Sequence, residues 1–76
     1  MDKSELLKIL GKRIQYLRES KKLTQVDLVG KMEGRIDTTN ISRIESGRTN
    51  PTIHTLHRIS EALEVPLKEI FDFTEL

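Results

Sequence analysis

The 76-residue sequence contains no cysteine and no tryptophan, and its aromatic side chains are one tyrosine and two phenylalanines. Without cysteine, neither a disulfide framework nor a thiolate metal site can hold the fold together. No apolar run approaches the length that a membrane span needs, and the N-terminal MDKSELLKIL lacks the apolar core of a signal peptide. We therefore expect a cytoplasmic protein that does not enter a membrane.

Glycine and proline are also scarce, with four and two residues, and they stand singly between stretches of helical periodicity. No linker, repeat or low-complexity segment divides the chain. Because 76 residues leave room for one hydrophobic core only, we expect a single domain over residues 1–76. A chain this small often gains stability by forming a dimer.

The net charge is only +1, but the charges are unevenly distributed. Residues 1–50 carry eleven Lys or Arg against seven Asp or Glu, whereas residues 51–76 carry two against five. A basic front and an acidic tail fit a protein that turns one face toward phosphates. Ordinary scatter of surface charge in a small, charge-rich protein is the alternative.

The first expected helix starts after Ser4 and ends near residues 20–22. Gly11 in its interior costs about 1 kcal/mol relative to alanine, which indicates close packing against another helix. Steps of three and four residues give this helix one apolar face, made of Leu7, Leu10, Ile14 and Leu17. Four cations of this segment are expected to form a solvated basic rim, made of Lys12, Arg13, Lys21 and Lys22.

Two short helices and a turn are expected within residues 24–46. Thr24 fits the N-cap of the second helix, with Asp27 at the capping-box position three residues later. This helix runs to about Met32 and buries Leu28 and either Val29 or Met32. The turn 33–36 follows, and its last residue, an isoleucine, is expected to fill the space between the two helices.

Asp37 is expected to cap the third helix, where its carboxylate also meets the positive end of the helix dipole. Ile41 and Ile44 face the core, and Gly47 fits the position just past the C-cap. With the isoleucines inside, the third helix turns a polar face outward, made of Thr38, Thr39, Asn40 and Arg43.

The last two helices follow prolines. The fourth is expected to start after Thr52 and to carry an apolar stripe, made of Ile53, Leu56, Ile59 and Leu63. Pro66 interrupts the chain again before a short fifth helix that starts near Leu67. Since all the periodicity is helical and no strand alternation is present, we predict an all-α fold, a compact five-helix bundle.

The exposed face of the third helix predicts DNA binding. Arg43 can donate two hydrogen bonds to guanine, and Thr39 and Asn40 can contact base edges in a major groove. The backbone on the other side of the groove can be held by the residues that follow, namely Arg48, Thr49 and Asn50. The alternative is that Thr and Asn merely favour helix starts and solvent.

No arrangement of residues predicts catalysis or a bound cofactor. His54 and His57 are three residues apart, but a metal site needs further ligands, and both histidines fall on the polar side of the fourth helix. The sequence has no Ser-His-Asp set, no phosphate-cradling glycine loop and no paired carboxylates that predict general acid–base chemistry. We expect no enzyme activity, no cofactor and no metal.

These features resemble the phage repressor/Cro-type helix-turn-helix proteins, the Xre family. The resemblance covers about residues 7–71 and is carried by LTQ at 23–25, ISRIESG at 41–47, NPT at 50–52 and VPLKEIF at 65–71. It implies a five-helix fold with a helix-turn-helix at about 24–46, operator DNA as ligand and a homodimer. In size the chain is similar to the small controller proteins of restriction–modification systems.

The resemblance also implies roles for single residues. Gln25 matches a glutamine that contacts a DNA phosphate at the start of the second helix. Arg18 and Glu45 match an ion pair that holds the first helix to the third. Ser42 and Arg35 are further candidates for DNA contact, and the role of Arg35 depends on the path of the turn 33–36.

Two departures from the family pattern are present. The turn 33–36 is about two residues longer than usual, which alters the angle between the helices that it joins. The second departure is Pro66, which stands where a capping Ser or Thr is common.

The C-terminal segment 67–76 is rich in apolar residues, which a small domain cannot easily cover alone. We expect part of it to form a two-fold dimer contact, with burial within the monomer as the alternative. The candidate dimer residues are Leu67, Ile70, Phe71, Phe73 and Leu76.

The predicted function is sequence-specific transcriptional regulation by a homodimer that binds an operator with two half-sites. The alternative is an antitoxin-type interaction protein, which masks a protein partner and binds its own promoter.

Overall fold

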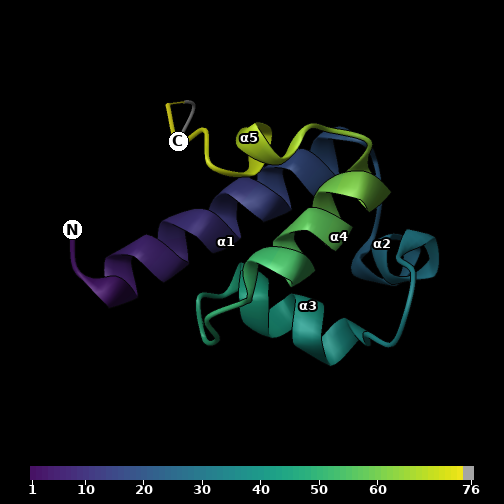
Figure 1. The fold of residues 1–76 in the computed structure, drawn as a ribbon, viewed down its shortest axis with the longest axis horizontal. Helices are drawn as coiled ribbons and strands as arrows, with labels where there is room; N and C mark the ends of the chain where they lie inside the picture. The colour runs from purple at the N-terminus through teal and green to yellow at the C-terminus, as the bar shows by residue number, and fades with distance from the viewer. Residues whose placement is uncertain (75–76) are drawn as a thin grey trace.

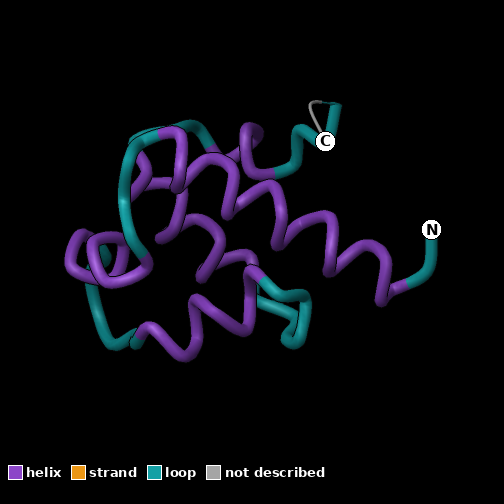
Figure 2. The backbone as a smooth tube through the Cα atoms, turned by 180° about the vertical axis from the view of Figure 1, so that it is seen from behind, coloured by secondary structure: helices purple, strands orange, loops and turns teal. Residues whose placement is uncertain are grey.

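The computed structural model describes residues 1–74, and the candidate dimer residue Leu76 lies outside this range. Five helices account for the regular structure of the described residues, which confirms the predicted all-α fold (Figure 1). They are α1 (Lys3–Ser20), α2 (Gln25–Lys31), α3 (Thr38–Glu45), α4 (Ile53–Leu63) and α5 (Leu67–Ile70). Figure 2 shows short loops between the helices and no strand in the drawn part of the chain.

The helices enclose one aliphatic core. The long α1 packs against α3 and α5, while α4 contacts α2 and α5 and α2 contacts α3. No helix within residues 1–74 is long and apolar enough to cross a bilayer. Every helix contributes to the core, whose buried members are Leu10, Ile14, Leu17, Leu28, Met32, Ile41, Ile44, Leu56, Ile59, Ala62, Leu63 and Ile70.

Short polar side chains cap the first four helices. Thr24 and Asp27 form the predicted reciprocal capping box on α2, and Asp37 Oδ1 accepts a hydrogen bond from a backbone N–H of α3 at 2.9 Å. Thr52 caps α4 in the same way. The predicted start of α1 after Ser4 is wrong, because Asp2 Oδ1 accepts the backbone N–H three residues later at 2.8 Å and α1 begins at Lys3.

Gly11 brings α1 directly onto the end of α3, as its position inside a helix predicted. A Cβ atom built at Gly11 would lie 2.3 Å from the carbonyl oxygen of Glu45 and 2.5 Å from that of Ile44. Gly47 then ends α3 with a φ of +76°. Its N–H bonds the carbonyl of Ile44, and the next N–H bonds that of Arg43, so a Schellman motif sets the exit path of the chain.

The expected apolar stripe of α4 does not include its first residue. Ile53 is 63% exposed, whereas Leu56, Ile59 and Leu63 are buried. The core therefore begins one turn into α4, and Ile53 lies on the loop side of that boundary. At the other end, Pro66 provides no side-chain hydrogen bond to cap α5.

Arg13 is not part of a solvated rim, and this prediction is wrong. The side chain is buried, and its guanidinium lies over the ring of Tyr16 with 5.4 Å between Cζ and the ring centroid. Nε donates to the carbonyl oxygen of Glu69 at 2.8 Å, and Nη2 lies 3.0 Å from the carboxylate of the same residue. Arg13 thus attaches α5 to α1.

Candidate nucleic-acid interface

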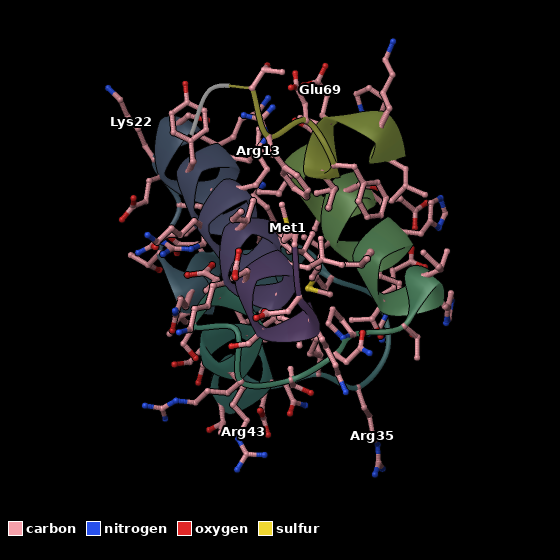
Figure 3. The ribbon with its side chains drawn as sticks, turned by 90° about the vertical axis from the view of Figure 1, so that its left-hand side faces the viewer. Met1, Arg13, Lys22, Arg35, Arg43 and Glu69 are labelled. Carbon is pink, nitrogen blue, oxygen red and sulfur yellow. The ribbon has the colours of Figure 1, made fainter. Side chains whose placement is uncertain are left out.

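The exposed face of α3 has the residues that the sequence predicted. Thr39, Asn40, Ser42 and Arg43 are exposed and Thr38 is half-buried, while the isoleucines on the opposite side are in the core. Figure 3 shows the Arg43 side chain directed away from the body of the protein. The face therefore consists of short polar groups and one guanidinium, carried on a helix that the core holds from behind.

The six arginines fall into two groups. Arg13, Arg18 and Arg58 each bond other parts of the protein. The other three are exposed, and their side chains have no hydrogen bond or ion pair with any residue of the described part of the chain, residues 1–74. These three are Arg35 in the turn before α3, Arg43 on α3 and Arg48 in the loop after it. The unpartnered guanidinium groups are thus concentrated around α3.

Arg18 and Glu45 form the expected ion pair between α1 and α3. Arg18 Nε lies 2.7 Å from Glu45 Oε2 and Nη2 lies 3.0 Å from Oε1, while Nη1 donates to the carbonyl of Leu23 at 2.6 Å. The hydrogen bonds to Glu45 raise the pKa of Arg18 above its usual value. Since both side chains are largely buried, removing either partner would leave an uncompensated charge, at a cost of about 3–5 kcal/mol.

Gln25 joins the same network at the start of α2. Its Nε2 donates to Glu45 Oε1 at 3.1 Å, so one carboxylate connects three helices. An amide nitrogen has two hydrogens, and the second has no partner among residues 1–74. The network therefore places a partly exposed amide beside α3, where the resemblance puts a phosphate contact.

The loop between α3 and α4 holds the remaining predicted residues. Arg48 and Asn50 are exposed and Thr49 is half-buried. The Schellman motif before them and the Thr52 cap after them fix both ends of this short segment. These three residues lie shortly after the carboxyl end of α3, with Ser46 and Gly47 between them and the helix.

One structural contact of the interface was missed by the sequence reasoning. Arg58 of α4 reaches the turn between α2 and α3, where its Nε donates to the carbonyl oxygen of Glu33 at 2.8 Å and its Nη2 bonds the same oxygen. A side chain that bonds a backbone carbonyl 25 positions away leaves no periodic pattern in the sequence. The only local signal in the sequence is the glycine at position 34, which suits a bend. In the structure Gly34 has a φ of +81°.

The two histidines remain outside this interface. Both are exposed on α4, and His57 Nδ1 lies 3.6 Å from a Glu61 carboxylate oxygen. Within residues 1–74, no three His, Cys, Asp or Glu side chains are grouped so as to hold a metal ion.

The candidate dimer residues differ in their exposure. Ile70 is fully buried in the monomer, so the prediction that it contacts a second subunit is wrong. Leu67 and Phe73 are partly buried against the core, and Phe71 is 43% exposed. Ile70 is held inside because α5 packs on both α4 and α1. Among the described members of this set, Phe71 offers the most exposed side chain.

Comparisons with known proteins agree with this geometry. The family profile described as a helix-turn-helix domain matches residues 11–75. The immunity repressor protein of Bacillus phage phi105 is 34% identical over 61 residues, which cover 80% of this chain and 41% of that protein. An uncharacterized HTH-type transcriptional regulator of Sinorhizobium fredii, y4dJ, is 31% identical over 71 residues, or 93% of this chain and 90% of the relative.

Among solved structures, the restriction-modification controller protein C.Esp1396I is similar, with 36% sequence identity and a TM-score of 0.73. The match covers 88% of this chain and 96% of that one. That protein was solved as a tetramer in complex with its natural 35 base-pair operator.

Proposed function

Because this chain belongs to the Xre-type helix-turn-helix family of transcriptional regulators, we propose that it binds a specific operator as a homodimer with one α3 in each half-site. The observation that carries the proposal is the exposed polar face of α3 with its unpartnered Arg43. Ile41 and Ile44 fix the orientation of this face, so the side chains that read DNA are held by the core.

Base reading is assigned to α3. Its diameter suits the major groove, where the Arg43 guanidinium can donate to guanine O6 and N7. Such a bidentate contact is worth about 1–3 kcal/mol of discrimination against a wrong base. The hydroxyl, methyl and amide groups of the neighbouring side chains contact further base edges, and these residues are Thr38, Thr39, Asn40 and Ser42.

Phosphate contacts on both sides of the groove position the helix. Gln25, oriented by its bond to Glu45, contacts the backbone on the α2 side. On the other side the contacts come from the loop after α3, from Arg48, Thr49 and Asn50. Contacts of this kind fix register and affinity but carry no sequence information directly.

A homodimer would occupy two half-sites of the operator, one with each subunit. Two copies related by a two-fold axis place their recognition helices in major grooves about 34–36 Å apart, one turn of DNA. The assembly of the similar controller protein C.Esp1396I as a tetramer on its operator supports an oligomer here. Occupancy of a promoter by such a dimer would block or recruit polymerase according to the position of the operator.

Fluorescence anisotropy on DNA from directly upstream of the gene, with a scrambled duplex beside it, tests this function. The upstream DNA should bind at least about a thousandfold more tightly, with a steep salt dependence. Arg43→Ala should lower the affinity for the operator roughly tenfold to a hundredfold and leave that for the scrambled duplex nearly unchanged. Gln25→Ala should weaken both duplexes by the same factor.

Two results would contradict the proposal. Equal losses of affinity for both duplexes in Arg43→Ala would show that Arg43 does not read bases. Weak binding of the wild-type protein, without preference for the upstream DNA, would show that this DNA does not contain a specific operator. The exposed face of α3 would then become the first surface to test for a protein partner.

A further inference from the structure

The turn between α2 and α3 is attached to the body of the protein. Two nitrogens of the Arg58 guanidinium donate to the carbonyl oxygen of Glu33. The following residue, Gly34, lies so close to this guanidinium that an added Cβ would be 3.0 Å from Nη2. The longer turn is therefore held against α4 rather than extended into solvent.

Arg35 follows directly in this turn and is exposed. Its side chain has no hydrogen bond or ion pair with residues 1–74. Figure 3 shows Arg35 and Arg43 both directed away from the protein at the end where α3 lies. Arg35 lies just before the start of α3, and Arg43 lies in its last turn. The two positive charges therefore flank the exposed face of α3 at its two ends.

Arg35 also lines a hollow of about 260 Å³ between the turn, α3 and the loop before α4. No acidic residue is among its lining residues, which include hydrogen-bond donors from Asn40, Asn50 and Arg58. Such a set of donors suits a phosphate group.

Two acidic side chains lie nearby. Asp37 is beside Arg35 in an adjacent hollow, but its carboxylate already accepts the backbone N–H of Asn40. Glu33 lines a separate hollow with Lys31 and His54. Neither acid lines the hollow between the turn, α3 and the loop.

From these contacts we infer that Arg35 binds a DNA backbone phosphate at the edge of the half-site, and that Arg58 is the positioning residue that holds the turn for this contact. The inference rests on the proposed function and adds the turn 33–36 to the DNA interface. A phosphate is the expected target because Arg35 precedes the helix that enters the groove, where the sugar–phosphate backbone passes.

The first test compares Arg35→Gln with Lys68→Gln in anisotropy titrations over a range of salt concentrations. Lys68 is likewise an exposed cation, and it belongs to α5, which lies at the opposite end of the protein from α3 (Figure 1). Arg35→Gln should weaken binding to the operator and to the scrambled duplex by the same factor, roughly tenfold, the size of one charged hydrogen bond. It should also reduce the slope of log K against log salt concentration by about one. Lys68→Gln should change neither quantity.

The second test is a double-mutant cycle for the positioning role. Arg58→Lys keeps the charge but loses the planar fork that bonds the Glu33 carbonyl twice. It should weaken DNA binding in the wild-type background and have no further effect in the Arg35→Gln background, because the contact it positions is already gone. A purely structural Arg58 would lower the affinity equally in both backgrounds, which would overturn its assignment.

Thermal unfolding followed by circular dichroism shows that each variant is folded before it is titrated. If wild-type protein prefers the operator but Arg35→Gln keeps the wild-type affinity and salt slope, the turn is not a phosphate contact and the proposed function stands. If Arg35→Gln loses affinity for the operator alone, Arg35 reads bases and the phosphate assignment is overturned. A wild-type protein without operator preference overturns the proposed function, while the salt slopes still decide the role of Arg35.

Discussion

At the scale of single residues, Gly11 decides how closely two helices approach. The atoms nearest to its missing Cβ are backbone carbonyl oxygens of α3, which cannot turn aside as a flexible side chain can. Gly30 in α2 provides the contrast, because nothing lies within 4 Å of the Cβ that it lacks. The two glycines share a helical setting and differ in their surroundings.

This difference predicts opposite effects of the same substitution. Gly11→Ala should lower the free energy of unfolding by about 1–3 kcal/mol, because α1 must move away from the end of α3. Gly30→Ala should raise it by up to about 1 kcal/mol, because alanine loses less backbone entropy in a helix. Urea denaturation of both variants measures the effects. A Gly11→Ala protein as stable as the wild type would mean that α1 and α3 do not meet this closely.

At the scale of the helices, the seven-residue α2 depends on its capping box. Thr24 Oγ1 accepts the backbone N–H of Asp27 at 3.0 Å, and Asp27 Oδ2 accepts that of Thr24 at 2.9 Å. The backbone hydrogen bond from Thr24 lowers the pKa of Asp27 below its usual 3.8. A short helix gains little from propagation alone, so these end contacts matter to whether it forms.

The lowered pKa of Asp27 predicts a pH dependence of stability. A carboxylate with a depressed pKa in the folded state stabilises the protein fully above the unfolded pKa and loses this effect as the pH falls through the folded pKa. We expect the stability difference between the wild-type protein and Asp27→Asn to be constant from pH 7 to about pH 5 and to shrink below the ordinary pKa of 3.8. Urea denaturation at a series of pH values measures this difference, since other titrating groups cancel. A difference that does not change with pH would show that the Asp27 charge contributes nothing.

The helices were predictable where their signals are local. Caps such as Thr24 and Asp37 precede apolar periodicity within a few residues, so the starts of α2 and α3 follow from the sequence. Ile41 and Ile44 likewise define the buried side of α3 and thereby its exposed face. At the start of α1 two capping residues compete, and the carboxylate of Asp2 takes the position two residues earlier than predicted.

The remaining features depend on contacts between distant positions. Arg13 and Arg58 both donate to backbone carbonyls, of Glu69 and Glu33, whose places are set only by the folded chain. Spacing did contain a signal for Arg13, which lies three residues after Leu10 and four before Leu17 on the apolar face of α1. The exposure of Ile53 had no such signal, because helical periodicity does not say where along a helix the core begins.

At the scale of the whole molecule, the C-terminal segment contains both a residue buried in the core of the monomer and a neighbour that is exposed and available for the proposed dimer contact. α5 is attached to α1 through Arg13 and Glu69, and this attachment keeps Ile70 inside the core. The neighbouring Phe71 remains 43% exposed on the outer side. Adjacent residues of one short segment therefore face in different directions.

This arrangement predicts that neighbouring substitutions affect different equilibria. Phe71→Ser should shift the monomer–dimer equilibrium toward monomer, measured by analytical ultracentrifugation over a concentration series, while the monomer keeps its stability. Ile70→Ala should instead lower the free energy of unfolding by about 2–5 kcal/mol, because it leaves a cavity between α5 and the core.

On DNA, Phe71→Ser should weaken binding to an operator with two half-sites but not to a single half-site, because only the former uses both recognition helices. Unchanged dimerisation of Phe71→Ser would place the subunit contact on another surface, and the exposed Leu6 on α1 would be the next residue to test.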